Sequence, residues 1–186
     1  ITQKTLWGAV SYWQATSKYF NYLEGDVETN DVAVEGKNYS SMEHHWDESF
    51  GYFGAAVDYH KITSYPDDLA RKTQMYFDTN ADGSVDFLSE FTTGWAVTAA
   101  KRDLCSDCTT GDFTETIFNA YLEGRTLITN QAPLAEVLAQ RDIINTTWEQ
   151  VVAAVTMHYI NDTWQEIEAQ VSASDFDAAA FTPGSE

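Results

Sequence analysis

Residues 78–90, "DTNADGSVDFLSE", have the spacing of a calcium-binding loop. Asp78, Asn80 and Asp82 stand at the first, third and fifth positions of an EF-hand-type loop. Gly83 stands at the sixth position, where the chain must turn sharply to wrap a hard cation in oxygen ligands. The sequence therefore predicts a bound calcium ion with these ligands: Asp78, Asn80, Asp82, Ser84 through its carbonyl, Asp86 and Glu90.

The end of this loop departs from the EF-hand pattern. Position twelve should be a bidentate glutamate, but Ser89 occupies it and Glu90 follows one residue later. Because calcium accepts flexible geometry, a longer closing turn can still bring Glu90 to the ion. A single loop lacks the paired partner of a sensor, so we expect a structural ion. The alternative is an Asn/Asp/Gly-rich turn between two helices, without an ion.

A second polar cluster lies in "SSMEHHWDESFGYFG", residues 40–54. On a helix, His44 and His45 stand four and three residues before Glu48, on a shared face. Such pairs bind iron or zinc, or let a carboxylate orient an imidazole. The HExxH pattern of zinc proteases is absent, and we name no catalytic residue. We expect a hydrogen-bonded structural network here, with a metal or ligand site at His44, His45 and Glu48 as the alternative.

The two cysteines stand in "CSDC", as Cys105 and Cys108. This spacing permits a disulfide, half of a zinc site or a redox pair. A four-cysteine zinc site cannot form, since the chain has no second CxxC, and no βαβ pattern supports a thioredoxin-like role. We favour a disulfide between Cys105 and Cys108, which indicates an oxidising compartment.

The charge balance excludes some partners. The chain has 29 acidic and 10 basic residues, a net charge of -19, so nucleic acids and anionic membranes would be repelled. No apolar run is long enough for a transmembrane segment. A salty or calcium-containing medium suits such a surface, because salt screens the self-repulsion. The charge is equally consistent with a solvated acidic surface of no special function.

The elements that position the two polar clusters, at 40–54 and 78–90, are predicted to be helices. Apolar residues recur at steps of three and four along most of the chain, and strand alternation is nearly absent. We expect helices over 2–24, from Ser40, over 66–77, from Leu88 with Phe91, Trp95 and Ala99 on one face, from Asp112, and over 133–171. The class is all-α, a helix bundle with long loops. We expect one helical-bundle domain at 1–171 and a loose C-terminal tail at 172–186.

Four segments resemble an imelysin-like bacterial family of unknown function, whose members are mostly exported lipoproteins. They are "KTLWGAVSYWQATSKYFNYL" (4–23), "MEHHWDESFGYFG" (42–54), "DTNADGSVDFLSE" (78–90) and "AAKRD" (99–103), and the resemblance spans about residues 4 to 170. It implies an all-α fold of two bundles, of which this chain would hold the central and later part. Imelysins proper carry a GxHxxE motif and are associated with iron uptake. His45 and Glu48 match its HxxE half, but Glu43 stands where that motif has glycine.

Together these features favour an exported, calcium-stabilised helical binding or accessory protein of the bacterial cell surface. The resemblance links it to metal or iron acquisition and implies an extracytoplasmic location, in the periplasm or on the outer surface. A metal-dependent hydrolase centred on His45 and Glu48 is one alternative. A structural subunit of an extracellular assembly, with its aromatic faces packed on neighbours, is another. The expected partner is a protein, either another chain or a further copy of this one at the cell surface.

Overall fold

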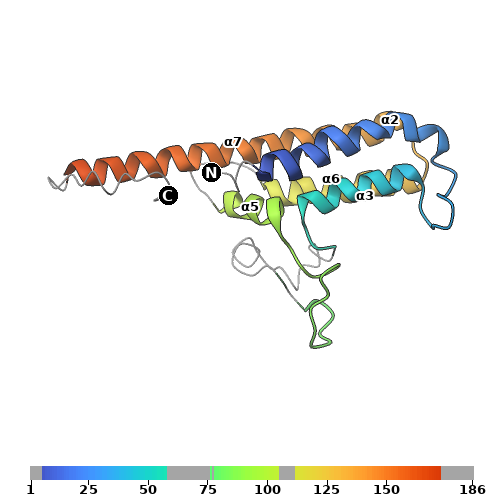
Figure 1. Cartoon of the computed structure of the whole chain (residues 1–186), viewed down its shortest axis with the longest axis horizontal. Helices are drawn as coiled ribbons and strands as arrows, with labels where there is room; N and C mark the ends of the chain where they lie inside the picture. Colours follow the sequence, from blue (N-terminus) through green and yellow to red (C-terminus); the bar gives the residue numbers. More distant parts are fainter. Residues whose placement is uncertain (1–5, 58–75, 77, 105–111, 173–186) are drawn as a thin grey trace.

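The computed structural model describes residues 6–57, 76, 78–104 and 112–172 (Figure 1). The predicted helix at 66–77, apart from Tyr76, lies outside the described residues. So do Cys105, Cys108 and the tail from residue 173. The described part is helical, with isolated β-bridges but no named strand, so the predicted all-α class is confirmed.

The N-terminal segment is one continuous helical run. It passes through η1 (Trp7–Tyr12), η2 (Gln14–Tyr19), η3 (Phe20–Tyr22), α2 (Leu23–Asp26) and η4 (Val27–Thr29). The predicted end of this helix at residue 24, just before Gly25, is therefore wrong. A helical glycine costs only about 1 kcal/mol relative to alanine, and the Val27 amide still bonds the Leu23 carbonyl across it.

Helix α3 (Ser41–Phe53) begins after Ser40, as predicted, and has a capping box. The Glu43 amide donates to Ser40 Oγ at 3.2 Å, and the Ser40 amide donates to Glu43 Oε2 at 2.9 Å. The helix ends at Gly54, whose φ of +87° is left-handed. Met42, Trp46 and Phe53 are buried at helical spacing, so one face of α3 points into the core.

Helix α5 (Gly94–Asp103) begins later than predicted. Leu88 and Phe91 precede the helix, and Leu88 is 85% exposed, so the predicted start at Leu88 is wrong. Thr93 is extended, with φ -137° and ψ -178°, which breaks the helical periodicity before Gly94. Before the helix, the Glu90 carboxylate accepts amides of the preceding loop, and the Thr93 amide donates to the Gly54 carbonyl.

The last two helices fit their predicted starts. Asp112 caps α6 (Phe113–Thr129) by accepting the Glu115 amide at 2.6 Å. Helix α7 (Leu134–Ser172) follows as a single long helix close to the predicted 133–171. Its buried residues lie between Val137 and Ala154.

The core lies between the N-terminal helical run and α3, α6 and α7 (Figure 1). Its largest fully buried side chains are Trp46, Trp148, Phe20, Phe53 and Leu23. The C-terminal part of α7 extends beyond the other described helices, while residues 78–92 project from the bundle on the side of α3 and α5 (Figure 1). None of the helices described here combines the length and apolar character needed to span a bilayer.

Candidate functional site

The side chains of the "HHWDE" stretch leave α3 in different directions. Trp46 is only 1% exposed, and its indole N–H donates to the Tyr121 carbonyl on α6 at 2.9 Å. One turn on, the Ser49 hydroxyl and the Tyr121 hydroxyl share a hydrogen bond of 2.9 Å. Because Trp46 is fixed in the core, its neighbours in sequence must lie on the flanks of the helix.

His45 is held by the N-terminal helical run. Its Nδ1 lies 2.6 Å from Asp26 Oδ2, and both side chains are largely buried. The ring stacks on Tyr22, with 4.4 Å between ring centroids. A carboxylate on Nδ1 fixes the orientation of the imidazole, as it does for many metal-binding histidines.

His44 has different neighbours. Its ring stacks on Tyr39 at 5.4 Å, and its Nε2 lies 3.9 Å from Glu48 Oε1, with both side chains partly exposed. The structure thus brings Glu48 near His44 and pairs His45 with Asp26. In the part of the chain that the structure describes, no three His, Cys, Asp or Glu side chains are placed to hold a metal ion together. Iron or zinc at His44, His45 and Glu48 stays a prediction.

The acids on the opposite flank of α3 bind Arg125 of α6. The guanidinium lies 2.6 Å from Glu43 Oε1 and 2.9 Å from Asp47 Oδ1, and the Thr129 hydroxyl also donates to Glu43 at 2.9 Å. Burial alone would raise the pKa of Glu43. Hydrogen bonds from the Ser40 amide, Thr129 and Arg125 outweigh this effect, so the pKa of Glu43 lies below its ordinary value. Burial raises the pKa of Asp47, and Arg125 offsets this only in part.

The acidic loop brings the side chains of Asp78 and Asn80 together. The Asp82 amide lies 3.0 Å from Asp78 Oδ1 and 3.0 Å from Asn80 Oδ1, so these two oxygens converge on one point. The Gly83 amide donates to Asp78 Oδ2 at 2.8 Å, and Gly83 has a left-handed φ of +85°. The predicted turn at Gly83 is therefore present.

The later acids bond the backbone that follows them. Asp82 Oδ1 accepts the Ser84 amide at 2.8 Å, and Asp86 Oδ1 accepts the Leu88 amide at 2.7 Å. Asp82 is also bonded by the Asn80 side-chain amide at 3.1 Å. Asp82 and Asp86 are exposed, so exchanging these hydrogen bonds for contacts with an ion would not disturb the core.

Glu90 closes the loop from inside. It is 1% exposed, and its carboxylate accepts the Thr79 hydroxyl at 2.6 Å, the Thr79 amide at 2.7 Å and the Asp86 amide at 2.9 Å. The Thr79 hydroxyl and the Asp86 amide are the chief reasons why the pKa of Glu90 falls to about 2. A charged Glu90 therefore ties the two ends of the loop together.

The base of the loop is attached to the end of α3. The Thr93 amide donates to the Gly54 carbonyl at 2.7 Å, and the Ala56 amide donates to Thr92 Oγ1 at 3.2 Å. A Cβ on Gly54 would lie 2.6 Å from the Thr93 carbonyl oxygen, so only glycine allows this approach. The loop and the His-carboxylate helix thus share one connection, although their side chains form separate clusters.

The sequence comparison adds a family to this geometry. The profile described as "Domain of unknown function (DUF4856)" matches residues 2–184, nearly the whole chain. The chain belongs to this family. Neither the curated proteins nor the solved structures gave a significant match.

Several contact residues of this DUF4856 domain escaped the sequence analysis. Asp26, Arg125 and Thr129 are the partners of the α3 side chains, and Thr79 is a partner of Glu90. No spacing rule links Asp26 to His45 or Arg125 to Glu43, because these pairs form only when separate helices pack. Thr79 does lie within the loop, but the EF-hand pattern assigns no role to its second position.

Replacing His45 by alanine in the DUF4856 domain is expected to cost about 1–3 kcal/mol of unfolding free energy, because the part-buried Asp26 carboxylate loses its partner. His44→Ala is the matched control and should cost less than His45→Ala, since its side chain is 43% exposed and its nearest carboxylate is 3.9 Å away. Urea unfolding measures both. If His45→Ala leaves stability unchanged but removes bound iron or zinc from the purified protein, the metal interpretation replaces the structural one.

Proposed function

We propose that this chain is an exported, calcium-stabilised helical binding or accessory domain of the bacterial cell surface. The observation that supports the calcium part of the proposal is the acidic loop, in which the Asp78 and Asn80 oxygens converge around one backbone amide. Oxygen donors in this spacing are the donor set that calcium prefers. The ligands would be Asp78, Asn80, Asp82, the Ser84 carbonyl, Asp86 and Glu90.

Electrostatics support a cation at this place. Residues 78–90 contain four acids and no lysine or arginine, on a chain whose net charge is -19. These carboxylates repel one another, and a divalent cation would offset that repulsion. Glu90 already accepts hydrogen bonds from three loop amides. It would therefore stabilise the loop conformation as well as bind the ion.

The attachment of the loop suggests what the ion does. Thr92 and Thr93 join the loop to Gly54 and Ala56, directly after α3. An ion that orders residues 78–90 would therefore stabilise the junction between α3 and α5. This is a structural role, and a dissociation constant as weak as about 10⁻⁴–10⁻³ M would suffice in a calcium-rich extracellular medium.

Removing calcium is expected to lower the melting temperature of the full chain. Calcium that binds only the folded loop stabilises it by about 2.7 kcal/mol at a hundredfold excess over the dissociation constant. Differential scanning calorimetry in calcium and in chelator measures the shift. Asp78→Ala should abolish the difference, because Asp78 accepts both the Asp82 and the Gly83 amides at the start of the loop.

The control for this experiment is Asp31→Ala, which removes one exposed acid outside the loop. It changes the net charge by the same amount, and the calcium response should persist. Equal melting temperatures in calcium and chelator for the unaltered chain, together with no heat of binding in a calcium titration, would overturn the proposal.

Export and the link to metal or iron acquisition rest on the imelysin-like resemblance and on the predicted Cys105–Cys108 disulfide. The His-carboxylate helix is the place where such a role would be found. A metal-dependent hydrolase at His45 and Glu48 has less support, because His45 is paired with Asp26 and Glu48 lies nearest to His44. We therefore propose binding or scaffolding rather than catalysis.

A further inference from the structure

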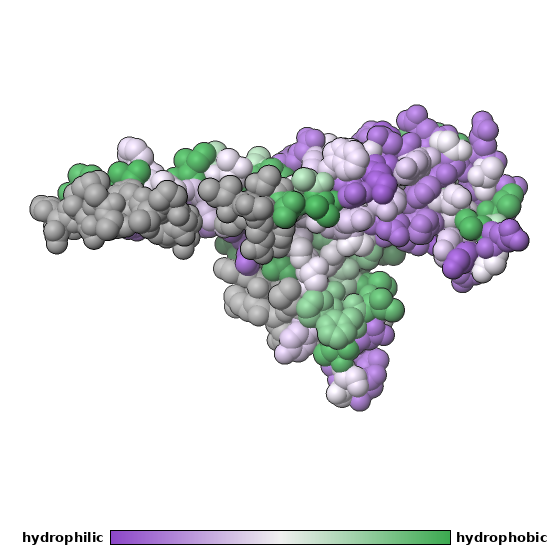
Figure 2. Space-filling model, viewed as in Figure 1, coloured by the Kyte–Doolittle hydropathy of each residue, from purple (hydrophilic) through white to green (hydrophobic). Residues whose placement is uncertain are grey.

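The C-terminal part of α7 has an exposed apolar stripe with no role in the bundle. Burial in the core ends at Ala154, yet apolar residues continue at alternating steps of four and three. They are Ala153, Met157, Ile160, Trp164, Ile167 and Val171. Trp164 is 60% exposed and Val171 67%, and hydrophobic side chains are visible along this part of α7 (Figure 2). We call this set the α7 stripe.

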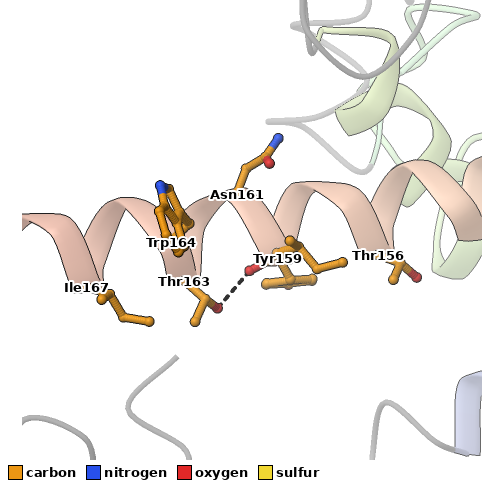
Figure 3. Close-up of a pocket in the computed structure, with 7 residues that line it drawn as sticks. Thr156, Tyr159, Asn161, Thr163, Trp164 and Ile167 are labelled. Atoms are coloured by element: carbon orange, nitrogen blue, oxygen red, sulfur yellow. Dashed lines mark hydrogen bonds between the residues drawn. The ribbon is translucent and has the colours of Figure 1, made fainter.

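The spacing of the α7 stripe is that of a coiled-coil seam. Steps of four and three residues give the 3.5-residue repeat that keeps one face of a helix against a partner helix. A hollow of about 570 Å³ lies along the same stretch, and its described lining runs from Thr156 to Ile167 (Figure 3). The Thr163 hydroxyl at its edge is turned back to the Tyr159 carbonyl at 2.7 Å (Figure 3), so it needs no further partner.

We propose that the α7 stripe is a dimer interface, in which two copies of this chain pair antiparallel through the C-terminal half of α7. The stripe matches itself in this direction. With a two-fold axis beside residue 162, Ile160 of one copy faces Trp164 of the other, and Met157 faces Ile167. Ala153, the smallest residue, faces Val171. Each contact occurs twice, as a two-fold interface requires.

The charges beside the stripe permit this pairing in spite of the net charge of -19. The flanking positions are Thr156, Asn161, Thr163, Glu168 and Gln170, and only Glu168 is charged. Asp162 lies on the far side of the helix, where its carboxylate is 3.1 Å from His158. Like charges therefore do not meet at the seam, although the two acidic bodies still repel at longer range.

The shape of the molecule also suits an antiparallel pair. The stripe runs along the C-terminal part of α7, whose end extends past the other described helices (Figure 1). In an antiparallel pair the two bundles lie at opposite ends of the paired helices, so they do not collide. This interface is remote from the acidic loop and does not depend on calcium binding there.

Analytical ultracentrifugation of the full chain over a range of concentrations tests the proposal. We expect a monomer–dimer equilibrium that tightens as salt rises to about 0.15 M, because salt screens the repulsion between the bundles. Trp164→Glu should weaken dimerisation by about thirtyfold or more, since it places a charge at the centre of the seam. Ala169→Glu adds the same charge on the far side of the helix and should leave the equilibrium unchanged.

Cross-linking tests the direction of pairing. Under mild oxidation, Ala153→Cys chains mixed with Val171→Cys chains should form a disulfide-linked dimer, whereas neither variant should do so alone. The unaltered chain, with Cys105 and Cys108, is the control. A chain that stays monomeric, because its own residues beyond Ser172 or another protein cover the stripe, would overturn the proposal, as would a dimer that Trp164→Glu leaves intact.

Discussion

Gly124→Ala is expected to lower the free energy of unfolding by about 3 kcal/mol, the upper end of the range for an overpacked core. Gly124 lies inside α6, where α6 crosses α3. A Cβ built on it would lie 2.1 Å from Cζ2 and 2.4 Å from Cη2 of Trp46. Trp46 cannot yield easily, because its indole N–H is bonded to the Tyr121 carbonyl. Urea unfolding with two independent probes measures the change.

The control is Gly51→Ala in α3. A Cβ on Gly51 meets nothing within 4 Å, so alanine should raise stability by about 0.5–1 kcal/mol through its better helix propensity. The same substitution, glycine to alanine, is thus expected to lower the free energy of unfolding at position 124 and to raise it at position 51. An unaltered or raised stability for Gly124→Ala would show that α3 and α6 do not approach each other in this way.

Trp46→Ala should cost about 3–5 kcal/mol, because it removes a large buried side chain and leaves a cavity. The indole packs on Phe20, with 5.2 Å between ring centroids, and edge-on against Tyr121 at 5.8 Å. It therefore joins the N-terminal helical run, α3 and α6. Thermal unfolding followed by circular dichroism measures the loss.

Trp13→Ala is the matched control for Trp46→Ala. Trp13 is 52% exposed, so the same truncation removes less buried area and should cost no more than about half as much as Trp46→Ala. A further check combines Gly124→Ala with Trp46→Leu in one chain. Trp46→Leu should relieve most of the clash of Gly124→Ala, so the effects of these two substitutions should not add. Simple additivity would argue against a direct contact.

The core position of Trp46 also explains the candidate site. Once Trp46 faces the core, helical geometry places His45 and Asp47 on the two flanks of α3. His45 then meets Asp26, and Asp47 meets Arg125. The polar side chains of "HHWDE" therefore contact two different neighbouring helices, α2 and α6. We expect substitutions of Trp46 to disturb both flanks together.

The sequence alone determined what depends on neighbours within one turn. The capping box of Ser40 and Glu43 and the cap at Asp112 are contacts across three residues, so their spacing predicts them directly. The length of α7 follows from a long helical pattern without breakers. The turn at Gly83 follows from the loop pattern in the same way. These features gave the all-α class and located both candidate sites.

Tertiary structure decided the partners. Asp26 lies 19 residues before His45, and Arg125 lies 82 residues after Glu43, so no local periodicity links them. The same holds for Gly54. It must be glycine because the backbone of Thr93, which is distant in sequence, packs directly against it. The sequence predicted that Gly25 would end its helix and that the next helix would begin at Leu88. The first failed because one helical glycine costs only about 1 kcal/mol and the backbone bond from Val27 to Leu23 still forms across it. The second failed because the extended Thr93 interrupts the helical pattern before Gly94. Local spacing fixes which residues share a helix face, whereas only the packing of the helices decides what that face meets.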